Sequence, residues 1–255
     1  MSKSLSWDYT LLAETYDLRP TYSNDVVEAL LAIAGLKAGS EACDVGAGTG
    51  HLSIHLARRS LMVSAIEPNE AMRLRGIANT ESLSSIRWFD GMAEDTKQQE
   101  GQFQLVTFGS SFNVCNQADA LIETSRILQP QGYFCCLWNH RVLTDPIQAQ
   151  IENIITQRVP SYTYGKRRED PSDVIQSSGL FTNIVHISSA YISMQSVESC
   201  VLAWRSHATL QRQAGDNFNQ TIHDIEHFLK SLHVKELRVP YQTVAWIARD
   251  ARKLP

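Results

Sequence analysis

The sequence predicts a doubly wound α/β fold, in which a mainly parallel sheet of seven strands has helices on both faces. Three observations predict it. Short apolar runs alternate with helical patterns along much of the chain, which is the order of a parallel sheet. The runs LMVSAI (61–66) and CCLW (135–138) are too apolar for a sheet with one wet face. A glycine-rich turn, DVGAGTG, follows the first strand, where such sheets hold their ligands.

The first half of the chain supplies five of these strands. A helix over 24–34 opens the pattern, because apolar residues recur at helical spacing between a cap at Ser23 or Asn24 and a stop at Gly35. Strands are then expected at 41–45, 61–66, 84–89, 103–108 and 132–138, with helices between them at 50–59, 69–77, 117–128 and, weakly, 94–99.

The second half of the chain follows a looser pattern. We expect a helix at 146–157, an irregular stretch at 159–170, a short helix at 171–178, a strand at 182–192, helices at 196–212 and 217–233, and a strand at 239–248. The irregular stretch holds the run KRRED, which we interpret as a solvated loop.

The organisation that follows is a single domain in three parts. They are an N-terminal helical arm with the first helix (1–40), a ligand-binding core (41–140) and a C-terminal part (141–255) with a helical insertion at about 194–235, before the last strand. The arm and the insertion are the candidates for a lid.

Composition excludes several classes of partner. The 23 basic and 27 acidic side chains give a net charge of −4, so no overall positive field draws in nucleic acid or anionic lipid. Five cysteines without C-x-x-C spacing predict reduced thiols rather than a disulfide framework or a zinc knuckle. The start MSKSLSWDYT lacks the apolar run of a secretory signal, and no run of about 18 apolar residues occurs. We therefore expect a cytoplasmic protein with no membrane, nucleic-acid or metal partner.

The glycine turn and an acid after the second strand predict a ligand site. Gly46 suits a tight turn, Gly48 suits close approach of a ligand to the backbone, and Gly50 suits close helix packing. Glu67 ends the second strand about twenty residues later, where a carboxylate accepts hydrogen bonds from ribose hydroxyls. A plainer interpretation stays open, in which the glycines form only a turn and Glu67 caps the helix that begins at Asn69.

The spacing of the turn favours a cationic ligand over a dinucleotide. Dinucleotide binders use Gly-x-Gly-x-x-Gly, which leaves room for a pyrophosphate at the helix N-terminus, and this turn is shorter by one residue. Asp44 would sit badly beside a pyrophosphate but suits a cation. S-adenosylmethionine (SAM) meets the description, because it has a sulfonium and an ammonium at one end and ribose and adenine at the other.

Residues 9–140 resemble the class I SAM-dependent methyltransferases, whose fold is Rossmann-like. The arm AETYDLRPTYS is similar to the Tyr-Asp-x-x-Arg-Pro-x-Tyr signature of the small-molecule branch, which includes trans-aconitate and quinone-pathway methyltransferases. DVGAGTG is similar to the first motif of this branch and IEPNEAM to its second. GMAED, FQLVTFGSSFN and ALIETSRILQPQGYFCCLWNHR follow in the family's order. The resemblance implies SAM as cofactor and a small-molecule methyl acceptor, in a monomer or homodimer.

The resemblance also implies which residues bind the two ligands. Those implied for the cofactor are Tyr16, Arg19, Asp44, Gly46, Ala47, Gly48, Glu67, Pro68, Gly91, Met92, Ala93, Gly109 and Ser110. Tyr16 and Arg19 are expected at the methionyl carboxylate, which suits a bidentate guanidinium; surface packing of the arm is the alternative. We also expect Tyr9, Tyr22, Asn113 and Trp204 to contact the acceptor, Trp204 as an aromatic side chain of a segment around it and not from the resemblance.

Three residues depart from the family pattern. Met92 stands where the family often has Asp for the adenine amine, so recognition of adenine would fall to backbone groups or to Glu94. Gln104 replaces the usual Asp of the Phe-Asp-x-Val pattern. Asn113 stands where many relatives have His, which would change the acceptor chemistry.

Methyl transfer requires few catalytic side chains. Methyl transfer from a sulfonium is an in-line displacement that depends mainly on alignment and on exclusion of water. A hydroxyl acceptor would also need a base, for which His140, after the fifth strand, is the candidate. Two alternatives stay open. Either His140 and Arg141 satisfy loop carbonyls, or the acceptor is a nitrogen or an acidic carbon that needs no base.

Two further patterns have structural interpretations. His223 and His227 are four residues apart, as in some metal sites, but a helical wheel places both opposite the apolar stripe of their helix, so we predict that they are solvated. Several aromatic residues are expected either in the core or around a flat apolar acceptor, with a cation–π contact to the sulfonium. They are Trp7, Tyr9, Tyr16, Tyr191, Trp204 and Tyr241.

Three functions are consistent with these residues. The leading hypothesis is an enzyme that methylates a small organic molecule with SAM. The second is a nicotinamide-dependent oxidoreductase, which would use the same glycine turn and ribose acid. The third is a SAM-binding module without catalysis, which the departures at Met92, Gln104 and Asn113 motivate.

Overall fold

The structure confirms the doubly wound α/β fold. It is a computed structural model that describes residue 10 and residues 13–253. Within these residues seven strands form one sheet in the order β3-β2-β1-β4-β5-β7-β6. Neighbouring strands from β3 to β5 are parallel, and β7 runs antiparallel to both β5 and β6. Because the strand order reverses beside β1, the ends of β1 and β4 form the switch point at which such sheets bind ligands.

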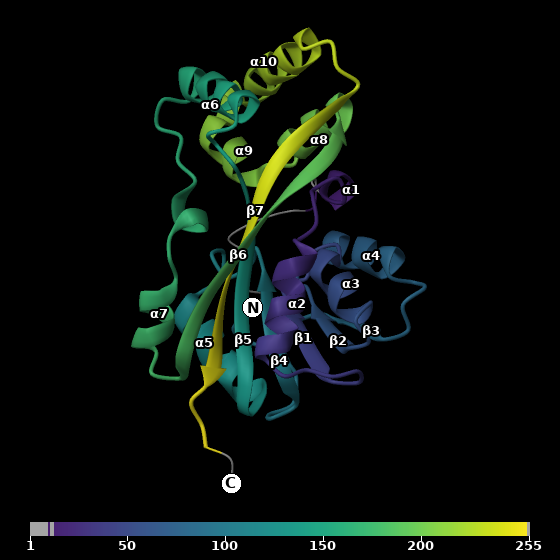
Figure 1. Cartoon of the computed structure of the whole chain (residues 1–255), viewed down its shortest axis with the longest axis vertical. Coiled ribbons are helices and arrows are strands. Elements are labelled where there is room, and N and C mark those ends of the chain that lie inside the picture. The colour runs from purple at the N-terminus through teal and green to yellow at the C-terminus, as the bar shows by residue number, and fades with distance from the viewer. Residues whose placement is uncertain (1–9, 11–12, 254–255) are drawn as a thin grey trace.

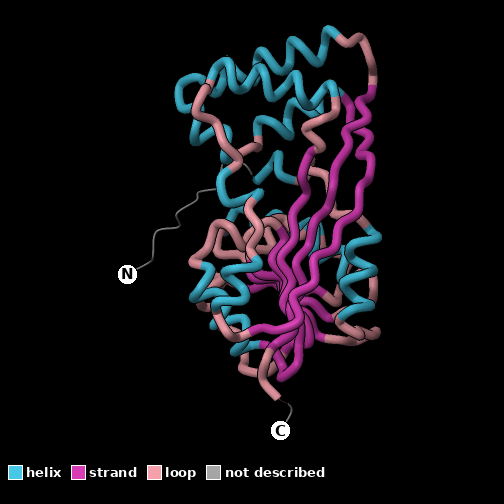
Figure 2. Tube along the Cα trace, turned by 60° about the vertical axis from the view of Figure 1, so that its left-hand side comes forward, coloured by secondary structure: helices cyan, strands magenta, loops and turns pink. Residues whose placement is uncertain are grey.

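The strands occur in the expected order. They are β1 Glu41–Val45, β2 Met62–Ile66, β3 Ile86–Phe89, β4 Phe103–Gly109, β5 Leu128–Arg141, β6 Phe181–Ser196 and β7 Glu236–Asp250. The last three are several residues longer than the sequence predicts. Their extra length takes them beyond the other strands, as Figure 2 shows for the strands that rise out of the fan of shorter ones.

The helices also follow the expected order. They are α1 Ala13–Tyr16, α2 Asn24–Ile33, α3 His51–Ala57, α4 Glu70–Asn79, α5 Gln117–Ile127, α6 Pro146–Arg158, α7 Ser172–Ser177, α8 Val197–Arg205, α9 Ala208–Ala214 and α10 Phe218–Ser231, with 3-10 turns η2 Gly165–Arg168 and η3 Gly215–Asn217.

Both faces of the sheet are covered, as the apolar strands predict. Alternate residues of β5 belong to different clusters: Phe134 and Cys136 pack with α5 and α7, and Cys135 and Leu137 pack with α2 and α3. Side chains of a strand point to opposite faces in turn, and both sets in β5 are fully buried. The sheet is therefore the centre of the lower half of the molecule (Figure 1).

A second, smaller layer lies beyond the carboxyl ends of the strands. We call it the cap: helices α6, α8, α9 and α10 together with the outer ends of β6 and β7 (Figure 1). It has an apolar cluster of its own, around Ile151, Trp204 and Ile225. The expected insertion at 194–235 is thus only part of the cap, because α6 joins it from before β6.

Two expected helices differ in the structure. The weak helix at 94–99 does not form: Met92 and Asp95 pair as an isolated bridge, and Thr96 bonds to the Glu123 carboxylate through both its N–H and its hydroxyl. The helix expected at 196–212 is broken into α8 and α9. The ring of His207 accepts a hydrogen bond from the N–H of Leu210 (3.2 Å), which caps a new helix at that point.

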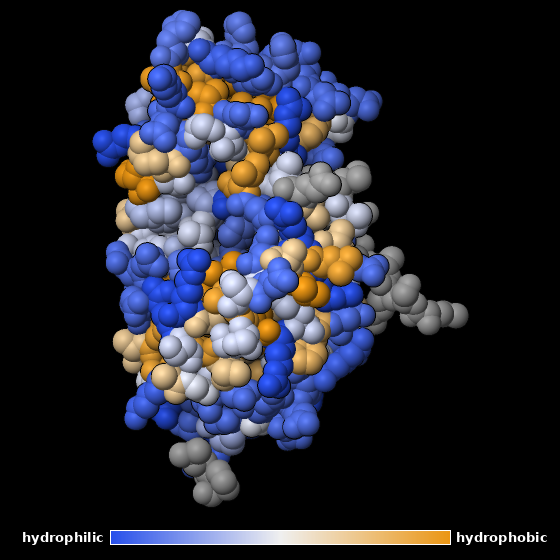
Figure 3. Space-filling view, turned by 90° about the vertical axis from the view of Figure 1, so that its right-hand side faces the viewer, coloured by the Kyte–Doolittle hydropathy of each residue, from blue (hydrophilic) through white to orange (hydrophobic). Residues whose placement is uncertain are grey.

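The surface on the side of α3 and α4 is mostly hydrophilic, with hydrophobic side chains exposed in small groups (Figure 3). Leu74 and Ile77 on α4 are among these exposed residues. Among the helices of the described residues, none is both long enough and apolar enough to span a bilayer.

Candidate functional site

The glycine turn lies between β1 and α3, at the switch point. Gly46, Gly48 and Gly50 have φ angles of +67°, +60° and +94°. A Cβ atom on Gly46 would lie 2.5 Å from the Cβ of Ser111, so the turn after β1 and the turn after β4 are in contact. Both the backbone conformation and the lack of space exclude larger residues there. The turn, which also includes Ala47, is a shelf of bare backbone.

The carboxylate of Glu67 folds back onto this shelf. Its Oε2 accepts a hydrogen bond from the N–H of Gly48 (2.8 Å), and its Oε1 accepts one from the N–H of Asn69 (2.9 Å). Burial raises the pKa of the Glu67 carboxyl to about 7. A carboxylate has about four acceptor positions, so two remain for a pair of hydroxyl donors. The helix cap is Asn69 itself, whose side chain accepts from the N–H of Met72.

Asp44 lies deeper than the shelf. Its Oδ2 accepts a hydrogen bond from the Ser53 hydroxyl (2.6 Å), and its Oδ1 accepts one from the Thr107 hydroxyl (3.0 Å). Burial raises the pKa of the Asp44 carboxyl to about 6. The side chain is only 1% exposed. Asp44 therefore ties β1 to α3 and β4, and any interaction with a cation on the shelf comes from within the fold.

The residues expected around an adenine lie at the carboxyl ends of β2 and β3: Pro68, Gly91, Met92 and Ala93. A Cβ atom on Gly91 would lie 2.9 Å from the Cγ2 of Ile66, so a glycine lets this turn pack against the end of β2. Glu94, the other candidate for adenine, accepts a hydrogen bond from the N–H of Asn116 (2.7 Å). It thereby holds the start of α5.

The arm passes over the shelf and reaches the cap. The ring of Tyr16 lies 3.8 Å from the position that a Cβ atom of Gly48 would take. The guanidinium of Arg19 stacks over the Tyr16 ring at 4.2 Å and donates to the Tyr16 hydroxyl (3.2 Å). Arg19 also donates to the carbonyl and the hydroxyl of Ser206, between α8 and α9. The arm thus connects the shelf to the cap.

The end of the arm packs against the turn after β4. The hydroxyl groups of Tyr22 and Ser110 are hydrogen-bonded at 3.1 Å. A Cβ atom on Gly109 would lie 2.9 Å from the Tyr22 hydroxyl, so only glycine allows this approach. Further along, Tyr191 of β6 donates to the carbonyl of Thr21 (2.6 Å).

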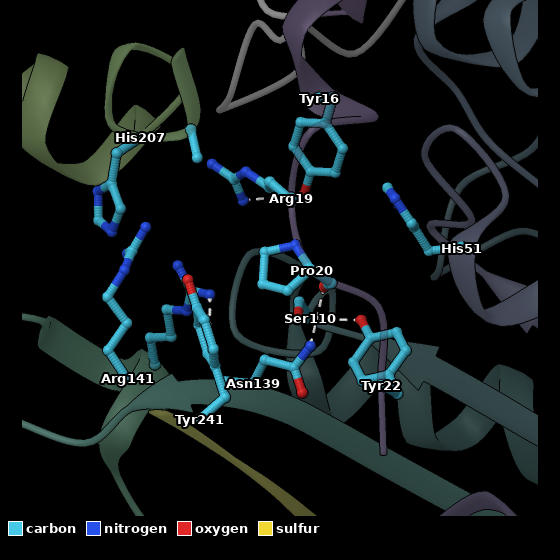
Figure 4. A pocket seen from close by; sticks show the side chains of 12 residues that line it. Tyr16, Arg19, Pro20, Tyr22, His51, Ser110, Asn139, Arg141, His207 and Tyr241 are labelled. Atoms are coloured by element: carbon cyan, nitrogen blue, oxygen red, sulfur yellow. Dashed lines mark hydrogen bonds between the residues drawn. The ribbon is translucent and has the colours of Figure 1, made fainter. Parts of the chain in front are cut away.

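A cavity of about 60 Å³ lies where the arm, the sheet and the cap meet. Its lining comes from the arm, the ends of β4, β5 and β7, the start of α3, the turn η2 and the cap. Figure 4 shows Tyr22 and His51 on one side of this cavity and Arg141 and His207 on the other, with Arg19 and Tyr16 between them. Three arginines line it: Arg19, Arg141 and Arg167. No carboxylate is among the described residues that do so.

His140, the candidate base, is not among the lining residues. Side chains alternate along β5, so His140 faces away from Asn139 and Arg141, which do line the cavity. A ring nitrogen of His140 is 3.1 Å from the carbonyl oxygen of Arg167. Burial, together with the nearby Arg168 and Arg167, lowers the pKa of His140 to about 4. This is the arrangement of the alternative interpretation, in which His140 satisfies a loop carbonyl.

The residues expected at the acceptor have different places. Tyr22 lines the cavity, whereas Tyr9 lies outside the described residues, as does Trp7. The side-chain oxygen of Asn113 accepts from the indole N–H of Trp138 (2.8 Å). Trp204 is fully buried in the cap, and the Arg141 guanidinium stacks on its ring at 4.1 Å.

Several lining residues were not predicted from the sequence. Arg167 belongs to the run KRRED, and the interpretation of that run as a solvated loop is wrong for this residue, because η2 folds Arg167 into the cavity. His51, Asn139 and His207 were not singled out either. Alternation along β5 would have paired Asn139 with Arg141, but nothing local in the sequence marks Arg167 or His207.

The histidine pair of α10 behaves as the helical wheel predicts. His223 and His227 are both exposed, whereas Ile222 and Ile225 are buried. In the described part of the chain, no group of three or more His, Cys, Asp or Glu side chains is placed to hold a metal ion. Of the aromatic residues, Tyr16 and Tyr241 line the cavity, and Tyr191 stacks on Tyr241 with ring centroids 5.8 Å apart.

Comparison with known proteins places this geometry in a family. Residues 42–132 match the family described as a methyltransferase domain. The matched segment is similar to a methyltransferase domain, and the comparisons together support a class I SAM-dependent methyltransferase. The matched segment runs from β1 to β5 and includes the glycine turn, Glu67 and the turns after β3 and β4.

Curated relatives of the methyltransferase domain share its central part. An uncharacterized methyltransferase of Mycobacterium tuberculosis is 28% identical over 124 residues, which are 48% of this chain and 48% of that protein. A demethylmenaquinone methyltransferase of Staphylococcus aureus is 32% identical over 107 residues, 40% of this chain and 44% of that protein. The chain thus spans about half the length of the curated relatives it matches.

Solved structures share the fold over more of the chain. The YcgJ protein of Bacillus subtilis is 15% identical with a TM-score of 0.58, and the match covers 91% of this chain and 100% of that one. Phosphoethanolamine N-methyltransferase 2 of Haemonchus contortus, in complex with S-adenosyl-L-methionine, is 13% identical with a TM-score of 0.54. That match covers 94% of this chain and 56% of the other.

The methyltransferase domain has the features that SAM requires. The shelf has no side chain of its own at Gly46 and Gly48. A Cβ atom on Gly48 would meet only ordinary contacts, at 3.4 Å from Met72 and 3.8 Å from Tyr16. Glu67 beside it has acceptor positions for two ribose hydroxyls. Arg19 makes three hydrogen bonds and has about five donors, so two remain for a carboxylate.

Proposed function

We propose that the protein transfers a methyl group from SAM to a small organic molecule by in-line displacement. The observation that supports this most directly is the shelf, on which the Glu67 carboxylate accepts a hydrogen bond from the N–H of Gly48, beside a cavity lined by the arm and the cap. A dinucleotide would need the longer turn that leaves room for a pyrophosphate.

The residues of the chain bind SAM, orient the acceptor and exclude water from the site. SAM supplies an electrophilic methyl group on a sulfonium and departs as S-adenosylhomocysteine (SAH). Glu67 binds the ribose, Arg19 binds the methionyl carboxylate, and the turns that contain Gly46 and Ser110 fix the methionyl end. Tyr16 and the cap close the site, which removes water and aligns the acceptor with the methyl group.

We propose that the acceptor binds in the space between Tyr22 and the cap. Alignment contributes more to catalysis than a general base, because His140 is hydrogen-bonded to the carbonyl of Arg167 and does not line the cavity. If His140 acts as a base, it does so after η2 has moved. Its substitution by Gln then lowers kcat for a hydroxyl acceptor by about a hundredfold, whereas a merely structural His140 leaves kcat nearly unchanged.

Calorimetry tests the cofactor assignment. We expect the protein to bind SAH and SAM and to show no heat with NAD. The Glu67→Gln variant should bind SAH at least about tenfold more weakly, because it loses a charged acceptor for the ribose hydroxyls. Glu70→Gln is the matched control, since Glu70 is exposed at the start of α4. Retention of NAD without SAH would choose an oxidoreductase instead.

Mass spectrometry tests the transfer itself. Incubation with methyl-labelled SAM and a metabolite extract should place the label on a small molecule. SAH binding without a labelled product from any extract would support a SAM-binding module and contradict the enzyme.

We also propose that the chain works as a single domain in the cytoplasm. Its five free cysteines, four of them buried, support the reducing compartment.

A further inference from the structure

We propose that the methyl acceptor is a small organic acid whose anionic group, a carboxylate or a phosphate, binds to Arg141 and Arg167. This inference rests on the methyl transfer proposed above and goes further, because it names the chemical class of the acceptor. It begins from the cavity, where the guanidinium groups of Arg19, Arg141 and Arg167 converge without a carboxylate.

None of these three arginines forms a salt bridge with a carboxylate in the part of the chain that the structure describes. Arg19 bonds to Ser206 and Tyr16, which are neutral. The guanidinium of Arg167 makes one long hydrogen bond, from Nη2 to the carbonyl of Asn139 (3.5 Å). The Nε atom of Arg141 is buried and has no hydrogen-bond partner. The three side chains are partly buried cations. Because buried charges in proteins are normally paired, this arrangement favours an anionic ligand.

The cations also act on one another. Burial lowers the pKa of Arg167, and the charges of Arg19 and Arg141 lower it further. Burial and the same cluster hold the pKa of His207 well below its usual range. One carboxylate, Glu152, interacts electrostatically with Arg141, but it accepts the Tyr164 hydroxyl and does not line the cavity. The cluster is therefore a site of net positive charge.

The cofactor cannot neutralise this charge. SAM has one carboxylate but also an ammonium and a sulfonium, so it brings net positive charge to the site. Its carboxylate matches one arginine, and Arg19 is the one on the arm that lies over the shelf. Arg141 and Arg167 are then left without a negatively charged partner, and the sulfonium of SAM adds a further positive charge nearby. The negative charge that balances them has to come with the acceptor.

The positions of the arginines support this division. Figure 4 shows His51, Tyr22 and Ser110 on the side of the glycine turn, and Arg141, Tyr241 and His207 on the side of the cap. An anion at Arg141 is thus separated from the shelf by the width of the cavity. A methyl acceptor held at that end would have the rest of the cavity between its acidic group and the methyl donor.

Arg141 is held in a fixed orientation. Its guanidinium lies 4.1 Å from the Trp204 ring and 5.6 Å from the Tyr241 ring, so the two aromatic residues hold it by its faces. The edges of a stacked guanidinium, which bear the N–H donors, are left for a ligand. This is the geometry that binds carboxylate or phosphate in a bidentate manner. Trp204 is accordingly a positioning residue rather than an acceptor contact.

His207 adds a neutral donor. Its Nδ1 accepts the hydrogen bond from the N–H of Leu210, so the proton of the neutral ring is on Nε2. Because its pKa is held low, the ring stays in this form at neutral pH. A ring of this form on the cavity wall donates to an anion and cannot accept a proton from the acceptor at that nitrogen.

Binding of simple probes tests the anion site. With SAH present at saturation, calorimetry would compare benzoate and phenyl phosphate with the neutral benzamide. We expect at least one anion to bind and benzamide not to. Arg141→Gln should weaken that anion by about tenfold or more and change the SAH dissociation constant by less than about twofold. Arg141→Lys keeps the charge and should recover part of the affinity.

Arg238→Gln is the matched control, because Arg238 is exposed on β7 and does not line the cavity. It should leave anion affinity unchanged, and melting curves of all variants establish that they fold. Equal binding of benzoate and benzamide, or equal effects of Arg141→Gln and Arg238→Gln on the anion, would overturn the proposal.

The acceptor itself gives a second test. An extract is separated on an anion exchanger, and the retained and unretained fractions are incubated with methyl-labelled SAM. A labelled product from the retained fraction, with a KM that Arg141→Gln raises about tenfold, supports the acid. A product from the unretained fraction alone overturns it while methyl transfer stands. Absence of SAH binding would instead contradict the methyltransferase assignment. In that case the binding of benzoate to the protein without SAH would show whether Arg141 and Arg167 form an anion site.

Discussion

The two sides of the cavity are built in different ways. The cofactor side is one continuous turn and the ends of neighbouring strands, and its main groups are backbone N–H groups and the Glu67 carboxylate. The cap side is assembled from β5, η2 and the cap, and its main groups are arginine side chains. Local backbone conformation fixes the first, whereas tertiary packing fixes the second.

This difference separates what can vary from what cannot. The shelf depends on a bare backbone at Gly46, so a change there alters the turn and the fold around it. Arg141 and Arg167 are single side chains on a strand end and a short turn, and each can be replaced while the sheet remains. We therefore expect the choice of acceptor to depend on the cap side, because a fold can retain its cofactor while its acceptor changes.

Gly46→Ala should have the largest effect and should break the cofactor side alone. The added Cβ would lie 2.5 Å from the Cβ of Ser111, whose hydroxyl is bonded to the carbonyl of Val45 (2.6 Å). The shelf must shift to relieve this contact. We expect the SAH affinity to fall by about a hundredfold, because a displaced turn would lose hydrogen bonds to the ligand that together contribute about 3 kcal/mol. Calorimetry measures this, and benzoate affinity should stay within about twofold.

Gly101→Ala is the control that isolates the contact from the backbone strain. Gly101 has a similar φ of +65°, but a Cβ atom there would meet nothing within 4 Å. It should lower the free energy of unfolding by about 1 kcal/mol and leave SAH affinity unchanged. Similar losses of SAH affinity in both variants would show that the shelf does not depend on close packing at Gly46.

The same contrast explains what the sequence could predict. The succession of strands along the chain, the turn at 46–50 and Glu67 follow from short local patterns, and the structure has them where the patterns place them. Arg167 comes from a charged loop that looks solvated in the sequence. Only the packing of η2 against β5 turns it inward, and no local pattern encodes that packing. The same holds for His207, which appears mid-helix in the sequence but begins α9.

The lengths of the last strands show the same limit. β6 and β7 extend beyond the expected 182–192 and 239–248, because they pair with each other over their outer ends in the cap. That pairing joins residues about 40 apart or more along the chain, such as Ser196 and Glu236. Local periodicity describes a strand, but not the partner that lengthens it.

A change of pH should affect SAH binding on the cofactor side more than anion binding on the cap side. Burial raises the pKa of Glu67 to about 7; the nearby Arg73 opposes this shift and Asp44 adds to it. Ribose hydroxyls need the ionised carboxylate as acceptor. Below pH 7 the free protein must therefore release a proton to bind, and the SAH affinity should fall by up to about tenfold per pH unit. Benzoate affinity should change little between pH 8 and pH 6, because benzoate stays ionised, the arginines stay charged and His207, whose pKa is held low, stays neutral.

Calorimetry at several pH values, in buffers of different ionisation enthalpy, measures both quantities. It should detect release of about one proton per SAH bound near pH 6 and none at pH 8.5. The Glu67→Gln variant should lose most of this dependence and keep only the part near pH 6 that comes from Asp44, whose pKa is raised to about 6. A constant SAH affinity over this range in the native protein would show that Glu67 does not contact the ribose as a carboxylate.

The smallest expected effect tests how the cap side is held. Trp204→Leu removes the ring on which Arg141 stacks at 4.1 Å, while Tyr241 remains beside the guanidinium. A cation–π contact of about 0.5–1 kcal/mol predicts a loss of about two- to fivefold in benzoate affinity, with SAH affinity unchanged. Trp204→Phe keeps an aromatic face and should recover most of that loss, whereas both variants lower stability because Trp204 is fully buried. Suppose that Trp204→Phe restores the melting temperature but not the anion affinity. The ring at position 204 would then stabilise the cap without orienting Arg141, and the orientation of Arg141 would depend on its other neighbours, such as Tyr241.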